Sequence, residues 1–394
     1  MTLKLMVVGG SILQLDAVIE AKRMGLDVAV VDFNPLCVAK ELADKFYPES
    51  THSEEDVLEA ALRYRPDGII TLCTDWAQRS VSYACERLKL RAISYETAKL
   101  ATDKLKSIQR FRDCGISHPH FVYFHRGDDI EPIKAQFSLP CIAKPIDSSG
   151  SRGVVMIHHE HEWQECLDYA ASYSKEGSVV IQDFMDGPEV SVEVIILKGE
   201  PRVLAITDKT TTGYPHFVET MHVQPTGLSE ETAHMVRELA VDACRCLELN
   251  TGAAHVEIIV TKDGPKLVEV GARMGGDFIS THLVKLSTGI NMTELVIREA
   301  LGLEPTLSQA QQKASAIIYL TPEDGIYQGI DNLEDVLSMP GVVEVHIEKK
   351  VGDELGKLSS SVDRLGHILV QAETREEVLV YAKEAKEKLI IKRK

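Results

Sequence analysis

The segment HVEIIVTKDGPKLVEVGAR, residues 255–273, has the pattern of a β-hairpin. Two β-branched runs flank the dipeptide Asp263-Gly264, which favours a tight turn. If the turn is centred on Asp263, Glu257 pairs with Glu269, and both share one face with His255 because side chains alternate along a strand. The other face should be buried and carries five aliphatic residues, namely Val256, Ile258, Val260, Val268 and Val270.

Two facing carboxylates repel each other, because opposed residues on paired strands have Cβ atoms about 5 Å apart. A divalent cation between them would remove the repulsion, and Mg²⁺ typically takes one or two carboxylates plus substrate phosphates. The hairpin by itself also fits two solvated acids without a function. A register slip of one residue would turn one carboxylate away.

The composition narrows the possible functions of the 394-residue chain, which is long enough for two or three domains. A net charge of −17 argues against nucleic-acid binding, since affinity for a phosphate backbone comes from Lys and Arg. We expect no membrane span, because no segment approaches the roughly 20 apolar residues required, and no signal peptide. The eight cysteines form no Cys-x-x-Cys pair, so we expect buried free thiols, no disulfide framework and a cytoplasmic location.

The order of expected elements predicts an α/β unit followed by α+β units. Residues 1–102 alternate strand and helix, which indicates a Rossmann-like parallel sheet. Its first turn lacks a full Gly-x-Gly-x-x-Gly pattern, so we predict no dinucleotide site. Asp75 follows the third strand and either lines a ligand crevice or, as we favour, caps the next helix. Residues 103–303 and 304–394 would form two further units.

Several features between residues 104 and 189 are suited to a nucleotide. Lys144 ends an apolar strand, where a charge is costly unless it is paired. Lys104 begins a helix, where the helix dipole disfavours a cation. The loop 147–153, DSSGSRG, is rich in small residues whose backbone N–H groups can enclose an anion. Each feature also has an alternative explanation. Lys104 could be an exposed lysine, the loop 147–153 a mobile hairpin tip, and residues 179–189 an ordinary strand and turn.

Together these motifs resemble the ATP-grasp superfamily over essentially the whole chain. The resemblance implies a three-domain ATP-grasp architecture with a lid at about residues 115–185, and ATP and Mg²⁺ (or Mn²⁺) as cofactors. Glu257 and Glu269 would bind the metal, but the family often has Asn where this chain has Gly271, which leaves the number of ions open. The implied ATP contacts are Lys104, Lys144, Ser149, Gly150, Ser151, Gln182, Asp183, Met185 and Glu189.

Within the superfamily, residues 269–277, EVGARMGGD, look most like L-amino acid ligases. Residues 211–225, TTGYPHFVETMHVQP, also resemble them, in a loop that lines the amino-acid site. That likeness would place Glu219 and His222 near the substrate amine, unless the loop is only a structural crossover. Arg273 would hold the substrate carboxylate and act in catalysis together with Lys144 and the backbone of Gly276.

The resemblance implies an ATP-dependent carboxylate–amine ligase that forms an amide through an acyl phosphate and releases ADP and phosphate. Its partners would be small-molecule carboxylates and amines, and homodimers are common among relatives. The first alternative is an ATP-grasp enzyme that activates bicarbonate or formate, as carbamoyl phosphate synthases and purine-pathway enzymes do. The second is an ATP-binding module without catalysis.

Overall fold

The computed structural model describes residues 2–148, 152–214, 216–305 and 311–394. The N-terminal part is a four-stranded sheet in the order β3-β2-β1-β4, and every pairing in it is parallel, as the sequence predicts. Alternate residues of its strands are buried on opposite faces, which is typical of a parallel sheet covered by helices. The elements are β1 (Lys4–Val8), α1 (Ile12–Arg23), β2 (Asp27–Val31), η1 (Val38–Leu42), β3 (Lys45–Tyr47), α2 (Glu54–Tyr64), β4 (Gly68–Ile70), α3 (Asp75–Leu88) and α4 (Tyr95–Ala101).

A long antiparallel sheet forms the centre of the molecule, with strand order β13-β12-β9-β10-β11-β14-β18-β16. Its C-terminal strands continue the sheet rather than form a separate one. The strands are β9 (Glu189–Leu197), β10 (Glu200–Thr211), β11 (Glu219–Gln224), β12 (Gly252–Thr261), β13 (Gly264–Gly271), β14 (Ala314–Leu320), β16 (Val342–Ile347) and β18 (Gly366–Ala372). Residues 219–224, expected in a loop, are therefore a strand that pairs with both β10 and β14.

The two faces of this sheet differ in polarity. Valines 190, 192 and 194 of β9 pack into a core with α8 (Glu230–Cys246). Glu189, Ser191 and Glu193 alternate with them and point to the other face. Around the C-terminal strands lie α12 (Arg375–Lys388) and a small sheet of β15 (Gly325–Asp331), β17 (Glu354–Leu355) and β19 (Ile390–Arg393), with α11 (Leu333–Leu337) and η4 (Ser361–Asp363).

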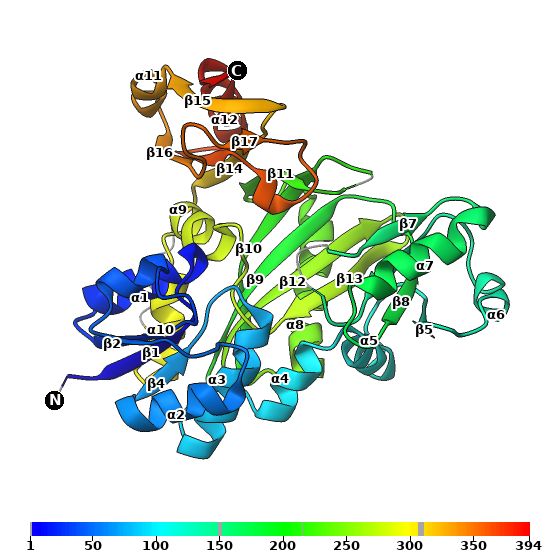
Figure 1. Ribbon diagram of the computed structural model, residues 1–394, viewed down its shortest axis with the longest axis horizontal. Coiled ribbons are helices and arrows are strands. Elements are labelled where there is room, and N and C mark those ends of the chain that lie inside the picture. Colours follow the sequence, from blue (N-terminus) through cyan, green and yellow to red (C-terminus); the bar gives the residue numbers. More distant parts are fainter. Residues whose placement is uncertain (1, 149–151, 215, 306–310) are drawn as a thin grey trace.

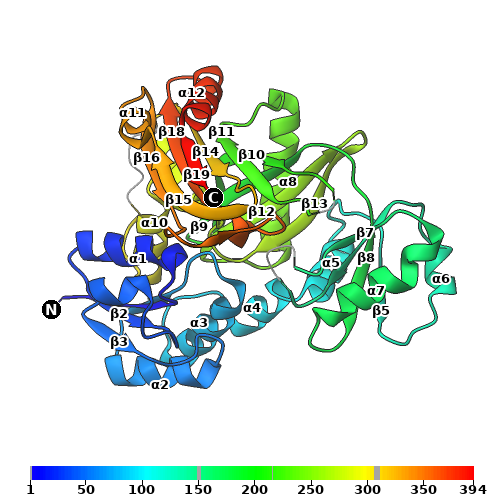
Figure 2. The same cartoon turned by 45° about the horizontal axis from the view of Figure 1, so that its top comes forward.

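A second four-stranded sheet forms a separate body with its own core around Trp163. Its order is β5-β8-β6-β7, with strands Phe121–His125, Ser178–Asp183, Cys141–Pro145 and Val155–Ile157. It contains α6 (Glu131–Lys134), η2 (Glu160–Glu162) and α7 (Trp163–Ser172), and α5 (Lys104–Asp113) leads into it. Figures 1 and 2 show this body and the N-terminal sheet on opposite sides of the central sheet.

The remaining helices follow β13: η3 (Ile279–Leu283), α9 (Val284–Thr288) and α10 (Met292–Ala300). α10 packs on α1 and on the N-terminal sheet, so it connects that sheet to the centre of the molecule. None of the helices in the described ranges combines the length and the apolar content that a membrane crossing requires.

The hairpin of β12 and β13 has the predicted pairing of Glu257 with Glu269, for a reason that differs from the prediction. Near the turn the register is centred between Lys262 and Asp263, because Thr261 pairs with Gly264. A bulge at Val268 then adds one residue to β13 and brings Glu269 opposite Glu257. Leu267 consequently takes the buried position expected for Val268.

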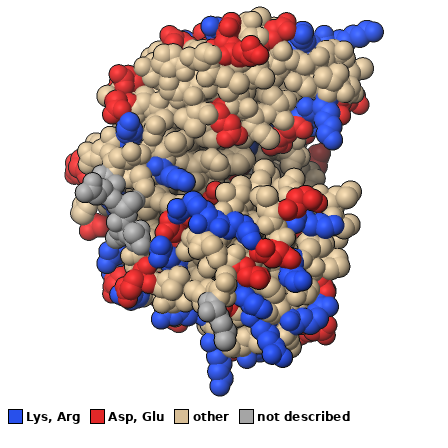
Figure 3. All heavy atoms as spheres, turned by 90° about the vertical axis from the view of Figure 1, so that its left-hand side faces the viewer, with Lys and Arg blue, Asp and Glu red and all other residues tan. Residues whose placement is uncertain are grey.

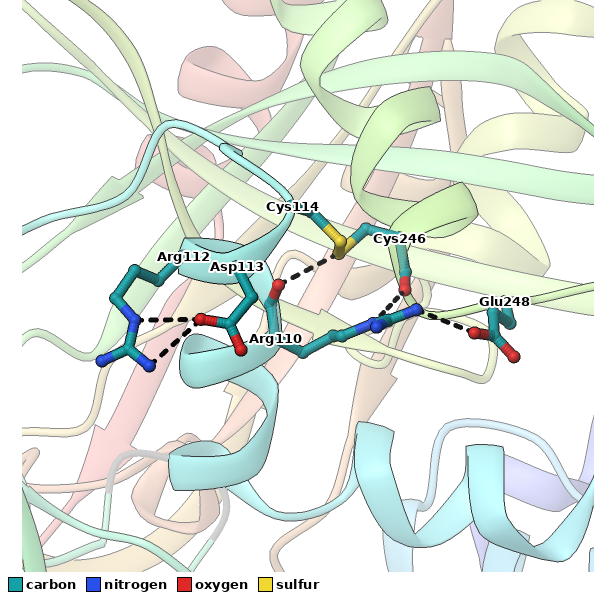
Figure 4. The surroundings of a disulfide bond; sticks show 6 residues. All are labelled: Arg110, Arg112, Asp113, Cys114, Cys246 and Glu248. Carbon is teal, nitrogen blue, oxygen red and sulfur yellow. Dashed lines mark hydrogen bonds and ion pairs between the residues drawn. A yellow bond between two sulfur atoms is a disulfide. The ribbon is translucent and has the colours of Figure 1, made fainter.

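The expectation that the cysteines are all free thiols is wrong for one pair. Cys114, after α5, and Cys246, at the end of α8, form a disulfide across a sequence separation of 132 residues. Arg110 reinforces the same contact, since its Nε donates to the Cys246 carbonyl at 3.0 Å and its guanidinium pairs with Glu248 at 2.8 Å (Figure 4). Spacing along the chain could not reveal this pair, because only the packing of α5 on α8 brings the two sulfurs together.

Replacing Cys114 by Ser should lower the free energy of unfolding by about 2–4 kcal/mol, because the cross-link closes a long loop in the unfolded chain. Urea unfolding monitored by circular dichroism measures the loss, and wild-type protein kept in reductant should match the variant. Denatured wild-type protein should take up six equivalents of iodoacetamide without reductant, one for each free cysteine. Uptake by all eight cysteines under these conditions would show that the bond is absent.

Candidate active site

The facing acids of the hairpin are neutralised by lysines from two other elements. The Glu269 carboxylate lies 3.0 Å from the ammonium of Lys104 at the start of α5. Glu257 lies 3.0 Å from the ammonium of Lys209 on β10, and 3.4 Å from His255 on its own strand. Burial alone would raise the pKa of Glu257, but Lys209 and His255 hold it well below its usual range. The two carboxylates are paired across adjacent strands and point to the same side of the sheet.

Lys209 is the centre of a larger acidic group on the polar face. Its ammonium also lies 2.6 Å from Glu189 on β9 and 3.8 Å from Glu219 on β11. Burial raises the pKa of Glu189 in spite of this lysine. The role of Lys209 was not predicted from the sequence. The alternation of Glu189, Ser191 and Glu193 on the neighbouring strand nevertheless indicates a polar face.

A cleft of about 650 Å³ lies between this hairpin and the sheet of β5, β8, β6 and β7. It brings together Lys104, Lys144, Gln182 and Glu269, all singled out from the sequence. The other lining residues are Asp75, Trp76, Ala101, Thr102, Ser107, Ile108, Phe111, His118, Asp147, Ser148, Val180, Leu267, Val268 and Val270.

Lys144 is only 8% exposed on β6. Its ammonium makes no hydrogen bond or ion pair with any residue in the described part of the chain. Burial lowers the pKa of Lys144 to about 8, with Lys104 acting in the same direction and Glu269 against it. A buried amine without a counter-charge in a cleft is suited to an anionic ligand.

The predicted phosphate loop is only partly covered by the structure. Ser149, Gly150 and Ser151 lie outside the described residues. Their neighbour Ser148 lines the cleft, and its carbonyl accepts a hydrogen bond of 2.9 Å from Lys104. The start of the loop is thus held at the lysine predicted to contact phosphate.

The four residues predicted to frame adenine and ribose are not all at this cleft. Gln182 is buried and lines it. Asp183 on β8 pairs with Cys141 on β6, and Met185 lies in the partly exposed connection to β9. Glu189 belongs to the acidic group around Lys209.

Arg273 comes from the end of the hairpin and pairs with Asp75 at the start of α3, with N–O distances of 3.0 and 3.2 Å. Our preference for Asp75 as a helix cap is wrong, because Thr74 occupies the cap position and Asp75 is the first helical residue. Burial and Asp75 both act on Arg273, and the net effect raises its pKa above the usual value. Nearby, a side chain added at Gly276 would meet no atom within 4 Å, so this glycine faces open space.

A second polar cluster surrounds Asp277. Arg364, which precedes β18, pairs with Asp277 at 2.9 Å and with Glu219 at 3.0 Å. His222 is almost fully buried and lies 3.5 Å from Asp277, whose pKa the cluster holds well below its usual range against the effect of burial. The predicted pair Glu219 and His222 therefore shares one cluster, and Arg364 and Asp277 are additions that the sequence did not indicate.

A buried pair supports the segment after the hairpin. Glu193 accepts a hydrogen bond of 2.5 Å from the Nδ1 atom of His255 and bonds the Ser280 hydroxyl. Burial lowers the pKa of His255, but Glu193 raises it to about 9, so the imidazole is charged at neutral pH. The Gly275 N–H donates to both Glu193 and Ser280, which holds Gly275 and Gly276 against the sheet.

The donor set fits a divalent ion that brings further ligands with it. Glu257 and Glu269 supply hard oxygen donors from directly opposite positions of the hairpin. The ammonium group of a lysine pairs with each of them. In the described ranges, no group of three or more His, Cys, Asp or Glu side chains is arranged to hold a metal by itself. Two carboxylates completed by nucleotide phosphates is the arrangement that Mg²⁺ commonly adopts.

Comparison with known proteins identifies the architecture. An ATP-grasp domain matches residues 137–282, and the L-amino acid ligase C-terminal domain 2 matches residues 318–392. The crystal structure of L-amino acid ligase from Bacillus licheniformis is similar over 100% of this chain and 99% of that chain, with a TM-score of 0.86 and 26% identity.

The names of two curated relatives describe different enzymes. The alanine–anticapsin ligase of Bacillus subtilis is 28% identical over 66% of this chain and 61% of its own length. The formate-dependent phosphoribosylglycinamide formyltransferase of Sulfurisphaera tokodaii is 26% identical over 97% of this chain and 95% of its own length. The chain spans less than two thirds of the length of several curated relatives, the Bacillus subtilis ligase among them. The chain has the ATP-grasp fold, with a match to an ATP-grasp domain followed by a match to an L-amino acid ligase C-terminal domain.

Proposed function

We propose that this protein is an ATP-dependent carboxylate–amine ligase that forms an amide bond and releases ADP and phosphate. The observation that carries the proposal is the meeting of Lys104 and Lys144 with Glu269 in one cleft, beside the paired Glu257. Two lysines supply charge for phosphates, and two carboxylates supply oxygens for a divalent ion.

The nucleotide would lie between the lid and the central sheet. Lys104 and Lys144 would contact its phosphates, and the loop that contains Ser149, Gly150 and Ser151 would cover them. Gln182, Asp183 and Met185 would border the adenine, and Glu189 the ribose. When bound at Glu257 and Glu269, Mg²⁺ or Mn²⁺ would neutralise phosphate charge during the transfer.

The reaction would proceed in two transfers. A carboxylate oxygen attacks the γ-phosphorus of ATP while the bond to the bridging oxygen breaks, which gives an acyl phosphate and ADP. The amine nitrogen then attacks the acyl carbon, loses a proton, and phosphate leaves. The first step depends mainly on positioning and charge compensation.

The residues around Arg273 would serve the reacting carboxyl group. Arg273 would orient the carboxylate through paired hydrogen bonds, as guanidinium groups do. The backbone N–H of Gly276 would stabilise the tetrahedral oxyanion. Glu219 and His222 would border the amino-acid site.

The second candidate is activation of bicarbonate or formate. The likeness to the phosphoribosylglycinamide formyltransferase over nearly the full length favours it. ADP release that depends on bicarbonate or formate, with no amino acid present, would decide for this candidate.

Lys144→Ala and Glu269→Ala should each lower kcat/KM for ATP at least about a hundredfold, the size expected when a preorganised charge is removed. Coupled ADP release measures the effect. Lys198→Ala and Glu304→Ala, which remove an exposed ion pair, are the matched controls and should keep wild-type rates. Wild-type turnover by a folded Lys144 or Glu269 variant would refute the proposed site.

The value of kcat/KM for ATP should fall above about pH 8. The pKa of Lys144 lies at about 8 instead of its ordinary value, so the ammonium that attracts phosphate is present below pH 8 and lost above it. A pH profile of kcat/KM for ATP reports groups of the free enzyme. A profile that stays flat to pH 9.5 would contradict this role for Lys144.

A mixture of amino acids with Mg-ATP should yield ADP and phosphate in equal amounts, because the intermediate is an acyl phosphate. A screen of amino-acid pairs for phosphate release, followed by mass spectrometry of the products, would identify the substrates. AMP and pyrophosphate in the chromatogram would instead indicate adenylation of the carboxylate.

A further inference from the structure

A second cavity of about 680 Å³ shares no lining residue with the first. α1 of the N-terminal sheet forms one wall, η3 the next, and β16 and β18 the third. The face in Figure 3 has α1 in its lower part and the C-terminal strands above, where uncharged atoms predominate. The lining residues are Ile12, Leu13, Leu15, Asp16, Ile19, Cys73, Phe278, Thr281, His282, Glu344, His346 and His367.

The cavity adjoins the end of the Arg273–Phe278 segment. Cys73 lines it, and its thiol donates to the Gly275 carbonyl at 3.0 Å. Phe278 lines it as well, two residues after the glycine that faces open space. A ligand in this cavity would therefore be next to the segment that orients the reacting carboxyl group.

The backbone at this segment is held in an unusual conformation. Asp277 and Phe278 have φ angles of 52° and 60°, and a bulky residue such as Phe278 rarely adopts such an angle. The Phe278 ring consequently lies 4.6 Å from the His367 ring and 5.2 Å from the His282 ring. Strained residues of this kind concentrate at ligand sites, where the surroundings hold them in place.

His367 has an unused hydrogen-bonding atom. The residue is 2% exposed, and its Nε2 makes no hydrogen bond within the described ranges. The nearest Glu344 oxygen is 3.8 Å away, which is too far for a hydrogen bond. Burial, with His346 and His282 nearby, lowers the pKa of His367 to about 3, so the ring is neutral. Buried polar atoms are normally paired, and a polar group of a ligand would pair this one.

The charges of the wall select the kind of ligand. The lining residues include two carboxylates, Asp16 and Glu344, and no lysine or arginine. A phosphate would face these negative charges without a fixed cation. An ammonium group would be attracted to them, while Ile12, Leu13 and Ile19 with the Phe278 ring would cover an apolar or aromatic body.

We propose that this cavity receives the amine substrate and selects a primary amine on an apolar or aromatic body over a phosphorylated amine. The inference rests on the ligase function proposed above. It adds a substrate class, and it argues against the phosphoribosyl amines of the formate-using relatives.

The test compares amines with hydroxylamine, which reacts with an acyl phosphate and is too small to need a pocket. With Mg-ATP and the carboxylate that gives the most ADP, kcat/KM is measured for phenethylamine, phenylalanine, ethanolamine and phosphoethanolamine. At least one of the two aromatic amines should exceed ethanolamine about tenfold, and phosphoethanolamine should be the poorest. A preference for phenethylamine identifies a simple amine, and one for phenylalanine an amino acid.

Two variants locate this preference. Ile19→Trp narrows the cavity from an exposed position of α1, and His367→Phe removes the unpaired nitrogen but keeps a ring. Both should lower the ratio of kcat/KM for the aromatic amine to that for hydroxylamine at least tenfold. Leu62→Trp on α2 is the matched control, because Leu62 and Ile19 are similarly exposed, at 54% and 48%, and its ratio should equal that of wild type.

The possible failures are distinguishable. Hydroxamate formation with an unchanged ratio in both variants, or good use of phosphoethanolamine, would overturn the cavity assignment and leave the ligase function intact. If no carboxylate yields ADP or hydroxamate, the ligase function itself is wrong, and the substrate assignment fails with it.

Discussion

Charge compensation across the polar face of the central sheet governs the whole site. Glu257 and Glu269 face each other on adjacent strands, and Glu189 and Glu219 add two more acids nearby. Partly buried charges of one sign are tolerable only when opposite charges are close. Lys209 from β10 and Lys104 from α5 supply them. A Mg-nucleotide would bring a cation for the acids and an anion for the lysines. It could therefore replace the ion pairs between these acids and lysines.

The elements that meet here are distant in the chain, and the topology explains why they meet. The central sheet orders its strands β13-β12-β9-β10-β11-β14-β18-β16, so the acidic hairpin and the C-terminal strands belong to one surface. Arg364 from the C-terminal region thereby reaches Glu219 and Asp277. Asp75 from the N-terminal sheet reaches Arg273. Each part of the chain contributes a charge to the same centre, which couples the stability of the parts to the geometry of the site.

The two cavities differ in the charged side chains that line them. Lysines as well as carboxylates line the cleft that suits a nucleotide. Carboxylates, neutral imidazole and apolar side chains line the cavity assigned to an amine. Glu193, His255 and Ser280 hold Gly275, near that cavity, against the sheet. The likeness to L-amino acid ligase and to a formate-using purine enzyme shows that the fold alone does not separate these activities.

Local sequence determined the parts of this protein that depend on short-range chemistry. Alternation of strands and helices predicted the N-terminal parallel sheet, and turn residues between β-branched runs predicted the hairpin, because these signals act within a few positions. The predicted facing of Glu257 and Glu269 holds because a bulge offsets a turn centred half a residue away from the predicted one. Motif order then indicated the ATP-grasp fold and the lysines of the cleft. Only the tertiary structure decided the bulge at Val268, the Cys114–Cys246 bond, the strand β11, the pairing of Asp75 with Arg273, and the recruitment of Lys209 and Arg364. These features arise from contacts between residues tens to hundreds of positions apart, and a side chain's partner at such a distance is set by packing rather than by its neighbours in the chain.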